Sequence, residues 1–274
     1  MQRRFSKGVI TIFVIVTVLA AAITVGLFTL LNRVTSFTAQ QEGCTITTPA
    51  GSIELEIEQA QVASAIAAVA ARRKLPERAV VIAYATGIQE SKLLNLPFGD
   101  RDSVGVFQQR PSQGWGKPSQ LIDPVYAAGK FFSALVKVKH YRKLPLHEAA
   151  QEVQRSADGS AYAQHEGEAK ILAAAFTGRV PKAVRCWFPA PTGKTPLPGA
   201  AAARQELARA LGSGTTLNAT SQKHGWLMST WSVTHAREFG LSRVRYNGQV
   251  WSSTDDDGGW KADAGAPAGR VEIS

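Results

Sequence analysis

The pattern of apolar and polar positions begins with a long, uninterrupted apolar run near the N-terminus. It reads GVITIFVIVTVLAAAITVGLFTLL over residues 8–31, and three basic residues precede it, Arg3, Arg4 and Lys7. At ~1.5 Å per residue, such a helix would cross a ~30 Å hydrocarbon core. The basic flank orients the tip (1–7) to the cytoplasm and predicts a single-pass cell-membrane protein with its bulk extracytoplasmic. A long cleaved signal peptide is the alternative, although no convincing small-residue cleavage site follows.

Helical periodicity dominates from residue 55 to residue 187. IEQAQVASAIAAVAARRKL carries apolar residues at helical spacing. Pro76 opens a second segment, PERAVVIAYATGIQES, which is apolar nearly all round and is therefore expected to be a buried, central helix. Further helices are expected at DPVYAAGKFFSALVKVK, LPLHEAAQEVQRSA and AYAQHEGEAKILAAAF. No strand alternation of any length precedes residue 200, so we predict a mainly α domain at 55–187 after a stem at 32–54.

The pattern changes at FPAPTGKTPLPGAAAA, where prolines and glycines replace apolar anchors. This composition predicts a linker at 188–200. The remaining residues, 201–274, read as a small α+β module. GWLMSTWSVTHAREFG is expected to be a helix, and LSRVRYNGQVWSS a hairpin that turns at Asn247-Gly248.

Composition and charge agree with a folded chain. Of 274 residues, 45% are hydrophobic and 19% are charged, which is enough for one or two cores. The net charge of +10 suits anionic wall polymers or lipid headgroups. The cations are spread along the chain without a nucleic-acid-binding motif, so no nucleic acid partner is predicted. A single span cannot form a transport pathway, which argues against a channel or carrier.

The chain has two cysteines, Cys44 and Cys186. In an oxidising compartment a pair of cysteines is more often a disulfide than a metal site, and this bond would close the helical domain. The five histidines show no metal-ligand spacing. We therefore predict a disulfide, no metal and no cofactor.

One stretch, GIQESKLLNLPFGDRDSVGVFQQRP, combines polar residues in a way that suggests catalysis. Glu90 ends the second helix, where apolar surroundings disfavour the charged form of a carboxyl group. A protonated carboxylic acid can donate a proton to a glycosidic oxygen. Phe107 and Gln108 would add an aromatic surface and an amide, which suit sugar rings and their hydroxyl groups. The structural alternative is a helix-end glutamate paired with Lys92 or Arg101.

These motifs resemble those of a known superfamily. Glu90-Ser91 followed by GVFQ at 105–108 resembles the Glu-Ser … Gly-Leu-Met-Gln signature of lytic transglycosylases, which belong to the lysozyme superfamily. GDRDSVGVFQ is similar to a loop of goose-type lysozymes, and LIDPVYAAGKFF to the helix that follows in transglycosylases. The stretch 80–175 as a whole resembles membrane-anchored actinobacterial proteins of this type. The resemblance implies a lysozyme-like fold and the cleavage of peptidoglycan glycan strands.

The resemblance also implies roles for individual residues. Glu90 matches the catalytic acid and base, Ser91 the serine that supports it, and Gln108 the cleft glutamine. Asp100 lies where goose-type enzymes place a carboxylate that helps to position water. The second goose-type aspartate is replaced by Arg110, which weakens the case for a simple inverting hydrolase.

A third motif departs further from the family pattern. EVQRS replaces the usual Ala-Tyr-Asn, so Gln154 stands in for the asparagine and Tyr162 takes the place of a later tyrosine. The implied chemistry is acid catalysis by Glu90 at the MurNAc–GlcNAc bond through an oxocarbenium-like transition state. Attack by the sugar's own 6-hydroxyl would give a 1,6-anhydro end, whereas a water held by Asp100 would give hydrolysis. Both outcomes remain open from the sequence.

The C-terminal module resembles the last part of a D-alanyl-D-alanine carboxypeptidase-like wall module. The closing strand of that family carries zinc-binding histidines in a His-Val-His pattern. Here GRVEIS places Arg270 and Glu272 at those positions, so a wall-binding or packing role without zinc is expected. We interpret the tryptophans of this module as core residues rather than sugar platforms.

Two other classes of function stay open. The departures in the third motif are compatible with a catalytically inactive scaffold that binds the cell wall. A wall-opening component of a secretion or conjugation apparatus is the other possibility. Loss of lytic activity in a folded protein would indicate the first, and neighbouring genes for a coupling ATPase would indicate the second.

Overall fold

The computed structural model describes residues 8, 16–29, 42–155, 159–189, 196–212, 214–255 and 257–274. By contacts within the chain, it divides into two units, Met1–Gln41 and Glu42–Ser274. The described part of the first unit is helical at residues 16–29. The candidate site lies entirely in the second unit.

The N-terminal unit corrects the prediction of a transmembrane helix. Over the ranges that the structure describes, no helix combines the length and the apolar character needed to cross a membrane. The helical residues 16–29 extend roughly 20 Å, which is short of a ~30 Å hydrocarbon core. Residues 9–15 and 30–31 of the predicted span, like its basic flank, lie outside the described residues. The prediction of a single-pass membrane anchor, from which the location was argued, is therefore wrong.

A three-stranded antiparallel sheet begins the second unit, in the order β2-β1-β3. Its strands are β1 (Gly43–Thr48), β2 (Gly51–Leu55) and β3 (Val184–Trp187). Cys44 lies opposite Cys186 across β1 and β3, and the two cysteines form the predicted disulfide.

This sheet corrects the prediction that no strand precedes residue 200. The described part of the predicted stem is a hairpin, in which Cys44, Ile46 and Thr48 are buried on one face of β1. A six-residue alternation of this kind is too short to stand out beside the long helical patterns that follow it.

The helical part follows β2 along the chain. It consists of α2 (Ile57–Arg72), α3 (Glu77–Ser91), a 3₁₀ turn η1 (Pro111–Gln113), α4 (Pro118–Leu121), α5 (Pro124–Leu135), α6 (Leu146–Gln154), α7 (Ser160–Ala163) and α8 (Glu166–Phe176). Local signals explain where two of these helices begin. Pro76 is the N-cap of α3, and the Asp123 carboxylate caps α5 by accepting a hydrogen bond from the Val125 amide at 3.0 Å.

The C-terminal residues form α9 (Gly199–Leu211), α10 (Gln222–Thr234), α11 (Ala236–Phe239) and a four-stranded antiparallel sheet in the order β6-β5-β4-β7. Its strands are β4 (Arg243–Tyr246), β5 (Gln249–Ser252), β6 (Trp260–Ala262) and β7 (Glu272–Ile273). The turn between β4 and β5 has positive φ at Asn247 (49°) and Gly248 (75°), as a type I′ turn requires. The predicted hairpin is therefore confirmed.

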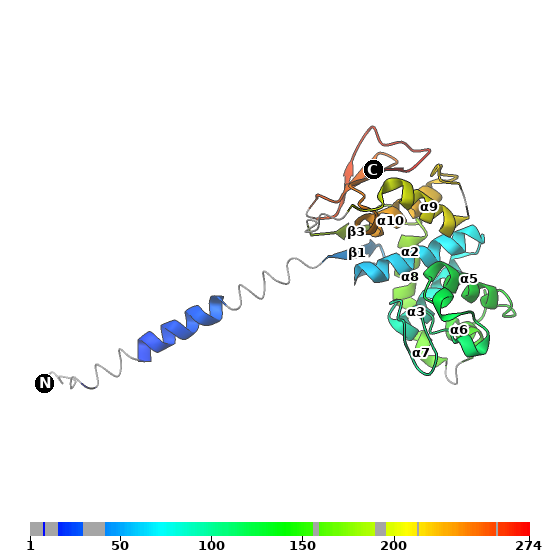
Figure 1. Cartoon of the computed structure of the whole chain (residues 1–274), viewed down its shortest axis with the longest axis horizontal. Helices are drawn as coiled ribbons and strands as arrows, with labels where there is room; N and C mark the ends of the chain where they lie inside the picture. The colour runs from blue at the N-terminus through cyan, green and yellow to red at the C-terminus, as the bar shows by residue number, and fades with distance from the viewer. Residues whose placement is uncertain are drawn as a thin grey trace. The chain divides into compact units, whose positions relative to one another are not determined.

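Both parts of the second unit share one core, with α2 in contact with each of them (Figure 1). α2 packs against α3 and α5, and also against α9 and α10. The indole N–H groups of Trp251 and Trp260 donate to backbone carbonyls of β3, at 3.1 and 2.9 Å. Trp226, Trp231 and Trp251 are at most 2% exposed, which confirms that these tryptophans are core residues.

Candidate active site

The end of α3 places Glu90 at the boundary of the core. The helix is buried along most of its length, and Glu90 is half-buried one residue before its last position. Lys92 then adopts a left-handed conformation (φ 56°), which ends the helix. The Ser91 hydroxyl donates to the Val106 carbonyl at 2.8 Å and ties this helix end to the following loop. Ser91 therefore supports the position of Glu90 through the backbone.

Two neutral donors converge on a single carboxylate oxygen of Glu90. The Tyr162 hydroxyl donates to Oε1 at 2.7 Å, and the Gln154 side-chain amide donates to the same atom at 3.1 Å. The Gln154 amide also donates to the Phe107 carbonyl at 2.8 Å. Glu90 is thus held from α6 and α7 as well as from its own helix, and three residues predicted from the sequence meet at one point.

Glu90 forms no ion pair with any described residue, and Arg101 instead approaches Asp100 at 3.8 Å. The alternative of a helix-end glutamate paired with Lys92 or Arg101 is therefore wrong. Both hydrogen-bond donors to Glu90 are neutral, so they stabilise the carboxylate without cancelling its charge.

The loop beside Glu90 is a tight turn between Val104 and Gln109, which pair as an isolated β-bridge. Gly105 has φ +76°, and a Cβ at this position would clash with the Leu121 carbonyl. The Gln108 amide donates to the carbonyls of Gly105 (3.1 Å) and Phe98 (3.3 Å). Gln108 therefore holds the shape of the loop that lies against the end of α3.

Phe107 does not provide the aromatic surface that the sequence suggested. Its side chain is fully buried and stacks on Phe131, with ring centroids 4.4 Å apart and an interplanar angle of 14°. Apolar neighbours on α5 draw this ring into the core. Only the backbone carbonyl of Phe107 contributes to the site, by accepting the hydrogen bond from Gln154.

Asp100 lies apart from Glu90 in the contacts that the structure records. Its side chain is 91% exposed, and its ionic contact is with Arg101 at 3.8 Å. The neighbouring Asp102 is the ordered carboxylate of this loop. It accepts from Arg110 Nε at 2.8 Å and from the Ser112 amide at 2.7 Å, and these hydrogen bonds hold its pKa well below the usual range.

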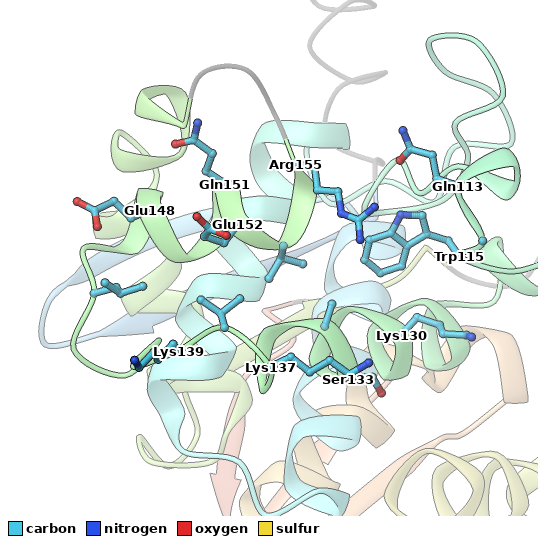
Figure 2. Close-up of a pocket in the computed structure, with 15 residues that line it drawn as sticks. Gln113, Trp115, Lys130, Ser133, Lys137, Lys139, Glu148, Gln151, Glu152 and Arg155 are labelled. Atoms are coloured by element: carbon cyan, nitrogen blue, oxygen red, sulfur yellow. The ribbon is translucent and has the colours of Figure 1, made fainter.

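The sequence did not predict a cleft that lies beside α6 and the residue that ends it, Arg155. It has a volume of about 900 Å³ and includes Trp115, Lys130, Lys137 and Arg155 in its wall (Figure 2). The seven-residue spacing of Lys130 and Lys137 and the single tryptophan before residue 187 were the available signals. Neither indicates a cleft until α5 and α6 are packed together.

Metal ligation has no support in the described part of the chain, where no group of three or more His, Cys, Asp or Glu residues could hold an ion. Buried titratable groups do occur. His235 is stacked on Trp231, with ring centroids 3.9 Å apart, and burial lowers its pKa to about 4. His235 is the C-cap residue of α10 and is not among the residues that contact Glu90.

Comparison with known proteins finds no family model that matches this chain and no curated protein that is similar to it. The function must therefore be inferred from the chemistry of the site.

Proposed function

We propose that the protein cleaves the glycosidic bond between N-acetylmuramic acid and N-acetylglucosamine in peptidoglycan, with Glu90 as acid and base. One observation carries the proposal. Tyr162 and Gln154 hold one oxygen of a half-buried glutamate that has no cationic partner among the described residues. The second carboxylate oxygen is left to carry and release a proton, as general acid–base catalysis requires.

The chemistry begins with Glu90 protonated on its second oxygen. It transfers this proton to the glycosidic oxygen as the C1–O bond breaks, through a transition state with oxocarbenium character. The carbonyl oxygen of the substrate's N-acetyl group attacks C1 from the opposite face. Glu90, now a carboxylate, takes the proton of the 6-hydroxyl, whose oxygen displaces the N-acetyl group and forms a 1,6-anhydro end.

The position of Asp100 favours this internal attack over hydrolysis. A carboxylate that directs water to C1 needs to be ordered near the reacting bond, whereas Asp100 is exposed and makes no recorded contact with Glu90. Lytic transglycosylases, which the sequence motifs resemble, produce this anhydro product. We therefore assign the transglycosylase outcome to the proposal.

The test is mass analysis of purified peptidoglycan after incubation with the full chain. Glu90→Gln keeps the shape of the side chain but can neither give nor take the proton, so we expect turnover to fall by about 10²–10⁴-fold. Glu168→Gln is the matched control, because this glutamate on α8 forms no hydrogen bond or ion pair with a described residue and its replacement should leave the rate unchanged. Asp100→Asn should keep most of the rate and still release 1,6-anhydro ends.

Two results would contradict the proposal. Equal release of muropeptides by the wild type and Glu90→Gln would leave a catalytically inactive scaffold as the better reading. Reducing ends in place of anhydro ends, together with loss of activity in Asp100→Asn, would replace the transglycosylase by a hydrolase.

A further inference from the structure

The cleft beside α6 is lined by charged side chains of both signs. Figure 2 shows lysines of α5 and the loop after it on one side, with Glu148 and Glu152 of α6 on the other. Arg155 and Trp115 lie toward the end away from Glu148. The volume of about 900 Å³ falls within the range of ligand-binding clefts.

The cations of this cleft have no carboxylate partner among the described residues. Lys130, Lys137, Lys139 and Arg155 form no ion pair within the described ranges, although many arginines elsewhere do, such as Arg209, which binds two carboxylates. Lys130 is half-buried, with its amine 5.5 Å from the centre of the Tyr126 ring. A partly desolvated, unpaired amine gains more from an external anion than a solvated one does.

The carboxylates of the cleft restrict the kind of anion that it can hold. Glu148 and Glu152 lie one turn apart on α6, and neither forms an ion pair with a described residue. A uniform polyanion laid along the cleft would meet these two negative charges at close range, which is unfavourable. A ligand with several carboxylates and one amine matches the lining, because each of its charges finds an opposite one.

Trp115 adds a flat apolar surface to this charged lining. Its ring is half-buried against the core, and its indole N–H donates to no described residue. An indole with an available N–H suits a peptide, because one part of the peptide can lie on the ring while a carbonyl at the ring edge accepts the hydrogen bond.

The cleft and Glu90 share the C-terminal turn of α6. Gln154 donates to Glu90, whereas the next residue, Arg155, lines the cleft. Residues of one helical turn therefore contact Glu90 and line the charged cleft. A substituent on a sugar bound at Glu90 would lie near this cleft. In peptidoglycan the substituent of the muramic acid ring is a short peptide that carries carboxylates.

We propose that this cleft binds the acidic peptide stem of the glycan strand, an inference that rests on the proposed function. Lys130, Lys137 and Arg155 take carboxylates of the stem, and Glu148 and Glu152 take its free amine. The cleft thereby selects strands that carry peptides and positions them for attack at the bond beside Glu90.

Calorimetric titration of the full chain carrying Glu90→Gln tests the proposal without turnover. The probe is the N-acetylated tripeptide L-alanyl-γ-D-glutamyl-meso-diaminopimelate, which has three carboxylates and one amine. We expect saturable binding that weakens with added salt, and loss of binding when the carboxylates are amidated. Lys130→Gln with Arg155→Gln should weaken binding by about tenfold. Lys182→Gln, which removes an exposed lysine outside the cleft, should leave it unchanged.

The charge pattern is tested by a second pair of substitutions. Glu148→Gln with Glu152→Gln should weaken binding of the tripeptide and strengthen binding of a poly(glycerol phosphate) oligomer. Tighter binding of that oligomer, or of an oligothymidylate, than of the tripeptide by the unchanged cleft would overturn the proposal. The proposal would also be overturned if the tripeptide did not bind, or if its affinity were the same in the double variant Lys130→Gln with Arg155→Gln.

The two proposals fail separately. Cleavage of peptidoglycan by the wild type, without binding of the tripeptide, would overturn the peptide-stem cleft and leave the role of Glu90 intact. Binding of the tripeptide with the expected variant pattern, in a protein that cleaves no glycan, would support the cleft and refute the proposed catalytic activity.

Discussion

At the scale of single residues, hydrogen bonds decide what each carboxyl group can do. Glu90 receives its hydrogen bonds from two neutral groups, whereas Asp102 accepts from the Arg110 guanidinium and a backbone amide. The cation stabilises the charged form of Asp102 and removes it from proton exchange at ordinary pH. Of these two ordered carboxylates, Glu90 is the one without a cationic partner among the described residues, which is why we propose it as the acid and base.

The contribution of Tyr162 can be measured separately from that of Glu90. Tyr162→Phe keeps the buried ring but removes the 2.7 Å hydrogen bond to Glu90. Because hydrogen bonds to charged groups contribute roughly 1.5–3 kcal/mol, we expect glycan cleavage to slow by about tenfold or more. The product should still carry 1,6-anhydro ends. An unchanged rate in a folded Tyr162→Phe protein would show that this bond does not support catalysis.

His235 should make stability depend on pH. Burial lowers its pKa from 6.5 to about 4, so between these values the unfolded chain binds a proton that the folded chain does not. This contribution to stability is complete above pH 6.5 and is lost as the pH falls toward 4. We expect a loss on the order of 2 kcal/mol between pH 7 and pH 5, measured by urea unfolding.

The matched variants assign this loss to one histidine. His235→Phe should flatten the pH dependence relative to the wild type over the same window, whatever its own stability at pH 7. His140→Asn alters an exposed histidine and should keep the wild-type slope. Parallel curves for the wild type and His235→Phe would contradict the assignment.

At the scale of elements, the turn at Val104–Gln109 holds the candidate site together. Ser91 binds one of its carbonyls, Gln154 binds another, and Gln108 closes it from within. The turn brings residue 105 so close to the Leu121 carbonyl that a Cβ there would clash, and glycine, which has no Cβ, avoids this. The conformation of this short segment therefore links α3, α4 and α6.

Gly105→Ala tests that role, with Gly114→Ala as its control. Both glycines have positive φ, at +76° and +80°, so each substitution costs roughly 1 kcal/mol of backbone strain. Only at Gly105 would the added methyl group also meet a backbone carbonyl, whereas nothing lies within 4 Å of it at Gly114. We expect Gly105→Ala to lower the free energy of unfolding by more than Gly114→Ala does, and to reduce glycan cleavage. Equal losses of unfolding free energy in the two variants would show that the turn adapts to the added methyl group.

At the scale of the whole molecule, Glu42–Ser274 is one compact unit in which both β1 and the C-terminal sheet are tied to β3. The disulfide joins β1 to β3, and Trp251 and Trp260 donate hydrogen bonds to β3 from the C-terminal sheet. α2 contacts helices from both halves of the unit. These connections favour cooperative unfolding.

Replacing Cys44 and Cys186 together by alanine should separate the covalent link from the packing. The bond closes a loop with a sequence separation of 142, so we expect stability to fall by roughly 3–5 kcal/mol in the chain-entropy model. Unfolding of this unit should nevertheless remain a single calorimetric transition in both proteins, because the tryptophan contacts persist. A separate transition of the C-terminal residues would contradict this prediction.

The sequence by itself determined those features that depend on local patterns. Apolar residues at helical spacing placed α2, proline signals placed the starts of α3 and α5, and Asn247-Gly248 indicated the hairpin. Helix starts, helix faces and tight turns all follow from residues close together in the chain. The motif resemblance selected Glu90, Gln154 and Tyr162. The long apolar run, however, led to a membrane anchor that no described helix supports.

Only the tertiary structure decided the features that depend on distant segments. It buried Phe107 against Phe131 and brought Tyr162 and Gln154 to one oxygen of Glu90. It also placed Lys130 of α5, with the lysines that follow this helix, opposite α6 in a cleft. A side chain of given type can line a site or fill the core, and the choice depends on which elements pack around it. That packing minimises exposed apolar surface over the whole unit, so it cannot be read from any single stretch of the chain.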